Sequence, residues 1–259
     1  MDKLFPRMYD CPESKQIAMG GLYWVVYIVF LPFLLLLACA GGAADNAAVY
    51  TCILAYFLIN GIIVFLIFRE YLIDSLWNVR LNKKHCFASV GLGVLVFFSI
   101  EAIMIFCGLY DYDMITVLPF PAADSLFGVR GVVLVMGKPI LMTLCLITIV
   151  PITMCCLYYA VGFASVCQNR MWLGYLVVAL ISAIPAVLQV TSMDVEIIDA
   201  LRYYVGMLPF HVCACWVYQR SDTIWGPILF HTVTNLLSVP IAIFLFFADM
   251  GDIVRQMIK

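Results

Sequence analysis

Residues 86–109 read CFASVGLGVLVFFSIEAIMIFCGL, and this run of apolar residues decides the fold class. It contains a single charged residue, Glu101, and it exceeds the ~20 residues with which a helix crosses ~30 Å of hydrocarbon. The strands of a transmembrane barrel alternate between polar and apolar side chains, and this run does not. It therefore predicts a membrane-spanning helix, whose backbone hydrogen bonds are all satisfied internally.

The rest of the chain has the same character. Of its 259 residues, 65% are hydrophobic and 12% are charged, whereas soluble domains carry ~25% charged residues. We therefore expect an all-α, polytopic bundle that forms one integral membrane domain over residues 1–259, with the lipid bilayer as a partner. The expected spans lie near residues 17–41, 47–68, 86–109, 138–167, 171–190, 203–219 and 224–248.

Three stretches have features of their own. The run over 138–167 would extend ~44 Å as one helix, so we expect a long, tilted helix bent at Pro151, preceded by an interfacial segment at 131–137. Residues 69–86 mix apolar and basic side chains, which is typical of an amphipathic helix on an anionic leaflet or of an ordinary cytoplasmic loop. The first run lacks a signal-peptide cleavage pattern, so we expect it to remain a membrane helix.

The distribution of charge predicts the orientation of the bundle. Under this span assignment nine of the fourteen basic residues fall on one side, which the positive-inside rule makes cytoplasmic. These residues are Lys3, Arg7, Lys15, Arg69, Arg80, Lys83, Lys84, Arg170 and Arg220. We expect seven spans with a cytoplasmic N-terminus, while Arg255 and Lys259 leave an even number, such as eight, open. The net charge of −2 gives no indication of a nucleic-acid partner.

A few polar side chains interrupt the apolar runs, and a buried polar group in a bilayer is a candidate functional residue. His231 and Asn235 stand four residues apart, and therefore on one helical face. They are expected either to address one wet cavity together or to join helices through hydrogen bonds. The full set is Asn60, Glu101, Gln189, His211, His231 and Asn235.

The residues that lead into His231 form a recognisable motif. Residues 218–235 read YQRSDTIWGPILFHTVTN, with a basic turn, Asp222 or Thr223 as the expected helix cap, and a proline in the first turn. This stretch resembles the closing motif of the CAAX prenyl protease and bacteriocin-processing family of intramembrane endopeptidases, known as CPBP or Abi. The resemblance covers roughly residues 138–245, where the order of the spans is also similar.

Two other motifs of that family are absent from this chain. The family carries Glu-Glu-x-x-x-Arg on one span and Phe-x-x-x-His on the next. Met154 and Cys155 stand where the glutamates are expected, and Tyr159 lies near the position of the arginine. In the second motif, Pro185 replaces the phenylalanine and Gln189 replaces the histidine.

The resemblance implies hydrolysis of a peptide bond in a peptide or lipidated-protein substrate, in a bacterial plasma membrane. In such a site a glutamate and a histidine activate water, while His231 and Asn235 would stabilise the oxyanion in a cavity near the cytoplasmic ends of the spans. Because the activating residues are missing, the chain is expected to be either a divergent endopeptidase with impaired catalysis or a pseudoprotease that binds a peptide or membrane-protein partner.

Other assignments of these residues remain open. Glu101 can supply the missing base from another helix, or it can be a structural glutamate. Cys155 can act as a nucleophile with His211 or His231 as its base, although a thiol in apolar surroundings is usually inert. Those three residues lack the ligand spacing of a metal site, and we expect neither a metal nor a cofactor. In a transporter, Glu101 and the histidines would instead form a proton relay.

Overall fold

The computed structural model describes residues 10–26, 46–107, 144–167, 170–192 and 197–237. Within these ranges the chain forms helices and no strand, which confirms the all-helical prediction. The interfacial segment expected at 131–137 lies outside the described residues, as do parts of the first and last expected spans.

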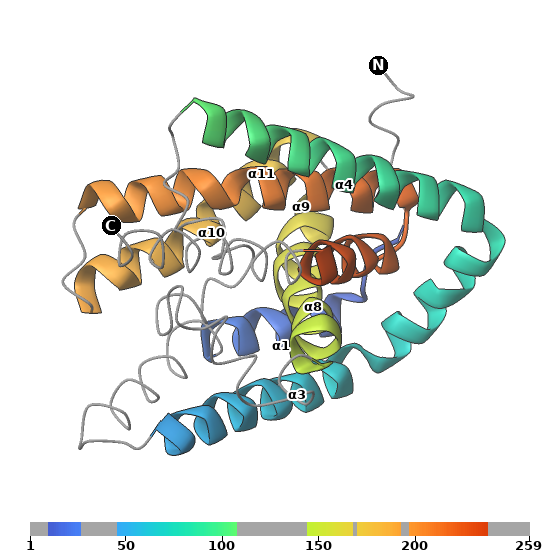
Figure 1. The fold of residues 1–259 in the computed structure, drawn as a ribbon. Helices are drawn as coiled ribbons and strands as arrows, with labels where there is room; N and C mark the ends of the chain where they lie inside the picture. Colours follow the sequence, from blue (N-terminus) through green and yellow to red (C-terminus); the bar gives the residue numbers. More distant parts are fainter. Residues whose placement is uncertain (1–9, 27–45, 108–143, 168–169, 193–196, 238–259) are drawn as a thin grey trace, which may run out of the picture.

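The described residues up to Cys107 form three helices. Helix α1 covers Ser14–Val25 and begins with a capping box between Glu13 and Gln16. Helix α3 covers Asn46–Leu81 and helix α4 covers Lys83–Phe106. Figure 1 shows α3 and α4 as the two arms of a V that meet at the break between them.

Helix α3 resolves the alternatives for the basic stretch after residue 68. The helix continues without a break through Arg80 to Leu81, so the expectation of a loop over this part was wrong. Trp77 is 58% exposed and Leu81 is 79% exposed. The Arg80 guanidinium stacks 4.7 Å from the centre of the Trp77 ring, which gives this end of the helix a cationic and aromatic surface suited to a membrane interface.

Residues 145–167 form the predicted long helix, and it is irregular around Pro151. Its parts are η2 (Cys145–Ile149), α8 (Val150–Met154), η3 (Cys155–Ala164) and α9 (Ser165–Cys167). The η segments have π-helical hydrogen bonding, which is common where a helix must accommodate a residue that does not fit the α-helical pattern. Pro151, which has no N–H to donate, lies in the short α-helical segment between the two π-helical ones.

The described residues after Arg170 form two long helices and a shorter one, called the last helix below. Helix α10 covers Met171–Ser192, helix α11 covers Ile197–Ser221, and a last helix extends over residues 225–237. Helix α11 packs along both α4 and α10. A Cβ atom added to Gly93 of α4 would lie 2.3 Å from Val217 Cγ2, so the glycine allows these two helices to approach closely.

The helices are long and apolar enough for an integral membrane protein. Among the residues that the structure describes, three stretches can cross a bilayer by length and composition: Ala55–Leu81, Lys83–Met104 and Ile147–Cys167. The third is 72% buried against 39% for each of the others, so it forms the centre of the bundle. Leu66, Leu95 and Leu180 are at least 60% exposed on the outer helices, where lipid can cover them.

Candidate functional site

The turn between α11 and the last helix docks against the side of α3. Asp222 takes a left-handed conformation with φ of 48°, which reverses the chain after Ser221. The Thr223 hydroxyl donates a hydrogen bond to the carbonyl oxygen of Ser75 at 3.1 Å. The Trp225 indole Nε1 donates to the carbonyl oxygen of Leu72 at 2.9 Å. These contacts fix where the helix that carries His231 begins.

The main cap of that helix comes from the N-terminal segment. The Ile224 N–H donates to Asp10 Oδ2 at 2.8 Å, and the Asp10 N–H donates in return to Asp222 Oδ1 at 2.9 Å. Of the two expected caps, Thr223 Oγ1 accepts only a longer hydrogen bond, from Trp225 N–H at 3.4 Å. Sequence reasoning missed Asp10 because a cap supplied from a distant segment leaves no local pattern.

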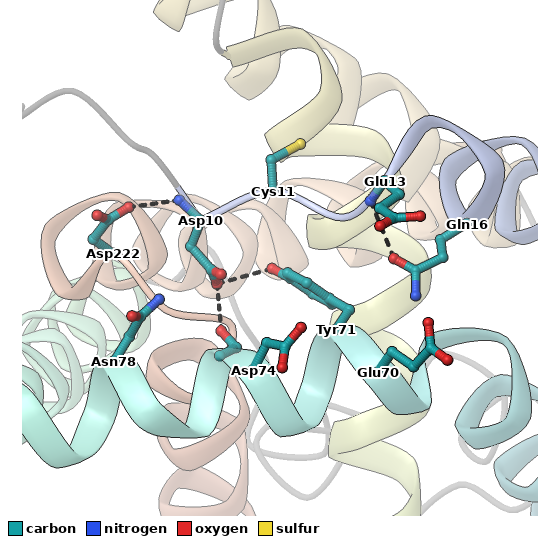
Figure 2. A pocket seen from close by; sticks show the side chains of 10 residues that line it. Asp10, Cys11, Glu13, Gln16, Glu70, Tyr71, Asp74, Asn78 and Asp222 are labelled. Carbon is teal, nitrogen blue, oxygen red and sulfur yellow. Dashed lines mark hydrogen bonds between the residues drawn. The ribbon is translucent and has the colours of Figure 1, made fainter.

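Asp10 is buried in a polar network at the edge of an acidic cavity, shown in Figure 2. Its Oδ2 also accepts hydrogen bonds from the Ser75 hydroxyl at 2.6 Å and the Tyr71 hydroxyl at 2.9 Å. The cavity measures about 380 Å³ and presents five carboxyl groups. It is lined by Asp10, Cys11, Glu13, Gln16, Glu70, Tyr71, Asp74, Ser75, Asn78 and Asp222.

Burial dominates the electrostatics of this network. It raises the pKa of Asp10 above its ordinary value of 3.8, the hydrogen bonds from Ser75, Tyr71 and Ile224 partly offset the effect, and the nearby charge of Asp222 adds to it. Burial also raises the pKa of the Cys11 thiol to about 11, so this thiol is protonated at neutral pH. In the described part of the chain, no three His, Cys, Asp or Glu side chains are arranged to hold a metal ion.

His231 lies in the interior of the bundle. Its side chain has no exposed surface, and neither Nδ1 nor Nε2 has a hydrogen-bond partner within the described residues. The ring packs against Phe210 in an edge-to-face contact, with centroids 4.8 Å apart. The open cavity that we expected around His231 is therefore not seen in the described part of the bundle.

Asn235 follows His231 by one helical turn and is 2% exposed. The two side chains therefore share a face of a helix that the bundle encloses. Thr232, between them in sequence, donates a hydrogen bond to the carbonyl oxygen of Ile147 at 3.0 Å. This bond fastens the last helix to η2 at the level of the candidate site.

His211 approaches the same region from α11, and Tyr159 holds it. The Tyr159 hydroxyl lies 3.0 Å from His211 Nδ1, and Tyr158 stacks on the imidazole with centroids 5.5 Å apart. Phe210 contacts the rings of both His211 and His231. Tyr159 therefore positions His211 in the interior of the bundle.

Glu101 lies on the face of α4 that is turned toward α11 and the last helix. Phe97, one turn earlier on α4, contacts Phe210 at 5.6 Å and Phe230 at 6.0 Å between ring centroids. Glu101 itself is 4% exposed, and its Oε1 is buried without a hydrogen-bond partner in the described residues. Glu101, the carboxyl group considered as a base from another helix, therefore lies in the interior of the bundle on α4.

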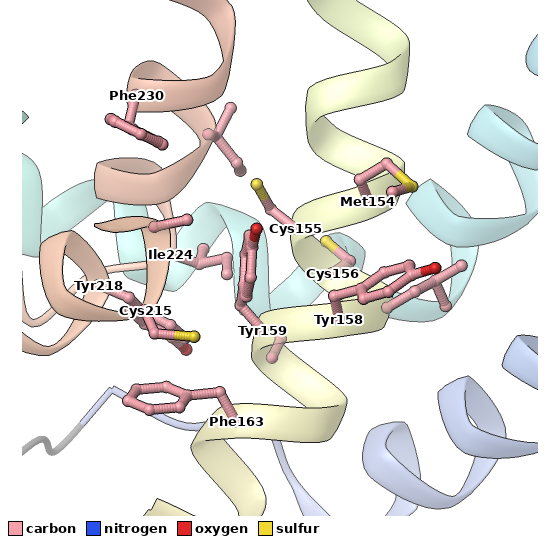
Figure 3. Packing of buried hydrophobic residues seen from close by; sticks show 14 of the residues in the cluster. Met154, Cys155, Cys156, Tyr158, Tyr159, Phe163, Cys215, Tyr218, Ile224 and Phe230 are labelled. Atoms are coloured by element: carbon pink, nitrogen blue, oxygen red, sulfur yellow. The ribbon is translucent and has the colours of Figure 1, made fainter. Parts of the chain in front are cut away.

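Cys155 is fully buried in the hydrophobic core drawn in Figure 3. It lies among Tyr159, Phe230 and Ile224, and it has no exposed surface through which a substrate reaches the thiol. A thiol enclosed in apolar packing is a poor nucleophile because the thiolate is not stabilised there. Cys155 and the neighbouring Met154, 7% exposed, therefore serve as core residues.

Two further polar residues complete the set. Asn60 joins α3 to α1, because its Oδ1 accepts a hydrogen bond from the Tyr23 hydroxyl, while its Nδ2 donates within α3 to the Tyr56 carbonyl at 2.6 Å. This role agrees with the expectation of interhelical hydrogen bonding for such residues. Gln189 belongs to α10, and its side chain lies outside the described residues.

Comparison with known proteins found no matching family model, no matching curated protein and no matching solved structure. The candidate site is therefore defined by its own geometry. It consists of two groups: the enclosed polar side chains Glu101, His211, His231 and Asn235, and the Asp10 network that caps the helix on which two of them stand.

Proposed function

We propose that the chain is an integral membrane protein that binds an extended peptide segment through His231 and Asn235 without cleaving it, once the bundle opens around these enclosed side chains. The observation that carries this proposal is the imidazole of His231, fully buried with both ring nitrogens lacking a hydrogen-bond partner among the described residues. Leaving a buried polar group unsatisfied costs about 1–3 kcal/mol. Such a group in a native protein calls for a partner, and a bound segment supplies one.

A peptide backbone offers hydrogen-bond donors and acceptors that complement those of the His231 and Asn235 side chains. A neutral imidazole offers one donor and one acceptor, and the Asn235 carboxamide offers both. Each peptide group offers a carbonyl and an N–H in return. Side chains four residues apart on a helix are about 5–6 Å apart. This spacing is close to the roughly 6.6 Å that separates peptide groups two residues apart in an extended strand.

We infer that the chain does not cleave the peptide, because the helix over residues 145–167 has no glutamate at the positions where the resemblance expects two. The resemblance aligns Met154 and Cys155 with those glutamates, and both are buried core residues. Without a carboxylate on this helix, nothing there accepts the proton of an attacking water. A peptide bound at His231 and Asn235 is then not hydrolysed.

Hydrolysis is the second candidate, and the position of Glu101 favours it. This carboxyl group lies on the face of α4 turned toward α11 and the last helix, with Oε1 lacking a partner in the described residues. A glutamate in an apolar interior is a suitable general base when water reaches it. In this alternative the chain is a divergent CPBP-type endopeptidase that takes its base from a different helix.

We also propose seven spans, with eight as the alternative, and a cytoplasmic N-terminus in a bacterial plasma membrane. Two contacts support a common basic end of the bundle. His85 Nε2 lies 2.7 Å from the carbonyl oxygen of Arg220, which brings Lys83 and Lys84 close to that turn. Tyr175 donates to Gln219 Oε1 at 3.0 Å, which places the beginning of α10, after Arg170, at the same end. Clustered cations mark the cytoplasmic side.

The experiment uses the full-length protein in lipid nanodiscs with fluorescent peptides that end in a CAAX sequence, farnesylated or unmodified. Binding is followed by fluorescence anisotropy, and the peptides are then weighed by mass spectrometry. We expect saturable binding, intact peptides, and at least a tenfold loss of affinity in His231→Ala and in Asn235→Ala. The matched control is Leu236→Ala. Leu236 lies on the same helix with 53% of its side chain exposed, and this variant should bind the peptides with wild-type affinity.

Each outcome is decisive. Equal affinity in the wild type and in both site variants contradicts binding through His231 and Asn235. Shortened peptides that disappear in Glu101→Gln contradict the absence of catalysis and establish the second candidate.

A further inference from the structure

The N-terminal segment reaches across the bundle to the helix that carries the candidate site. Asp10 makes three contacts with the turn region: Oδ2 with Ile224 N–H, the backbone N–H with Asp222 Oδ1, and the carbonyl oxygen with the Tyr218 hydroxyl at 3.1 Å. The same carboxylate is held by Ser75 and Tyr71 of α3. One residue thus joins the N-terminal segment, α3, the end of α11 and the beginning of the last helix. Figure 2 shows its bonds to Asp222 and to Tyr71.

We propose that residues 10–13 form a strap that controls how firmly the beginning of the last helix is held. The first N–H groups of any helix lack intrahelical partners and depend on a cap. Here the cap for Ile224 lies on a segment outside the expected spans, so displacement of that segment uncaps the Ile224 N–H and leaves the first turn held only by the bonds of Thr223 and Trp225 to α3. The strap goes beyond the proposed function, since it concerns the position of the helix and operates whether or not a peptide is bound.

The hold of the strap is local. Beyond its first turn, the last helix has its own attachments, among them the bond from Thr232 to the carbonyl oxygen of Ile147 and the burial of Phe230 against Phe97 and Phe210. Releasing Asp10 therefore loosens residues 224–228 first and leaves the level of His231 attached. The strap therefore controls the mobility of residues 224–228, where the helix begins, and does not determine the stability of the whole bundle.

Hydrogen–deuterium exchange of the full-length protein in nanodiscs tests this inference. In Asp10→Ala, amides in residues 224–228 should exchange about tenfold faster than in the wild type, the fold-change for a lost helix cap of ~1 kcal/mol or slightly more. Amides of α4 and α10 should exchange as in the wild type. Asp74→Ala is the matched control, because Asp74 lines the same cavity without bonding to the turn, and it should leave residues 224–228 unchanged.

Two results overturn the strap. One is unchanged exchange at residues 224–228 in Asp10→Ala. The other is an increase of similar size in α4 and α10, which would make Asp10 a general stabilising residue. If Asp10→Ala does not fold, Tyr71→Phe is used instead, because it removes one donor to the same carboxylate while the bonds of Ser75 to Thr223 and Ile224 remain, and it should give a smaller increase confined to the same amides. No increase in that variant would equally contradict the proposal. Peptide binding is not part of either readout, so failure here is distinct from failure of the proposed function.

Discussion

Asp10 caps the backbone N–H of Ile224 at 2.8 Å, although 214 positions separate the two residues in sequence. This relationship links the N-terminal segment to the helix on which His231 and Asn235 stand. A carboxylate near the N-terminus of a helix is favoured by the unpaired N–H groups and by the helix dipole. The first turn of the helix that carries the candidate site is therefore capped by a residue from the opposite end of the described chain.

We expect Asp10 to contribute to the pH dependence of the free energy of unfolding. Burial raises its pKa above 3.8, so between 3.8 and the raised value the folded protein binds more protons than the unfolded chain. The contribution of Asp10 to the free energy of unfolding therefore falls as the pH rises through this window. The groups that face or border Asp10 are Asp222, Tyr71, Tyr218, Cys11, Asp74, Glu13 and Glu70.

Asp10→Asn should remove this contribution, because the amide does not titrate. Unfolding in detergent, measured from about pH 3 to pH 7 to bracket the carboxyl range, should give a profile that falls less steeply with pH than that of the wild type. Leu236→Ala, which changes an exposed apolar side chain and no titratable group, is the control and should keep the wild-type slope. Identical slopes in the wild type and Asp10→Asn would show that Asp10 does not titrate as its burial requires.

Gly93→Ala tests the close contact between α4 and α11. The added Cβ would lie 2.3 Å from Val217 Cγ2, so the helices must separate or the side chain must move. We expect the free energy of unfolding to fall by about 1–3 kcal/mol, the usual cost of overpacking.

Gly91→Ala is the matched control for this prediction, since a Cβ there meets nothing within 4 Å. In a helix this change should be neutral or stabilising by up to ~1 kcal/mol. If the two variants have equal stability, α4 and α11 do not meet at Gly93, and the orientation assigned to Glu101 is wrong.

Tyr159→Phe should weaken the attachment of His211. The variant removes the hydroxyl that lies 3.0 Å from His211 Nδ1, and we expect a loss of about 0.5–1.5 kcal/mol, as for a typical hydrogen bond. A double-mutant cycle with His211→Leu isolates the pair. A coupling energy of zero would mean that the two side chains do not interact in the folded protein.

Glu101→Gln distinguishes a neutral glutamic acid from a charged carboxylate. An ionised carboxylate enclosed in the bundle without a cation is very costly, so we expect Glu101 to be uncharged. The amide has nearly the same shape, and the free energy of unfolding should change by less than about 0.5 kcal/mol. A large loss would instead indicate an ionised carboxylate with a specific partner.

The sequence was sufficient for the parts of the fold that depend on local patterns. Apolar runs predicted helices, and the long helix through Pro151 was predicted as one element. The Asp10 cap was not predictable, because nothing near residue 10 indicates that the chain returns to Ile224. The burial of His231 was also missed, since a polar residue in an apolar run is compatible with a wet cavity or with an enclosed site. Only the packing of Phe210 against its ring distinguishes the two.

The most direct test of the account is the nitrogen-15 NMR spectrum of the His231 ring in nanodiscs, recorded with and without the farnesylated CAAX peptide. His85→Gln and His211→Gln variants assign the signals of the three histidines. The account predicts that at saturating peptide at least one His231 ring nitrogen shifts to a hydrogen-bonded position, while the His85 signals do not move. His231 signals that stay unchanged at saturation would contradict the claim that this imidazole binds the peptide.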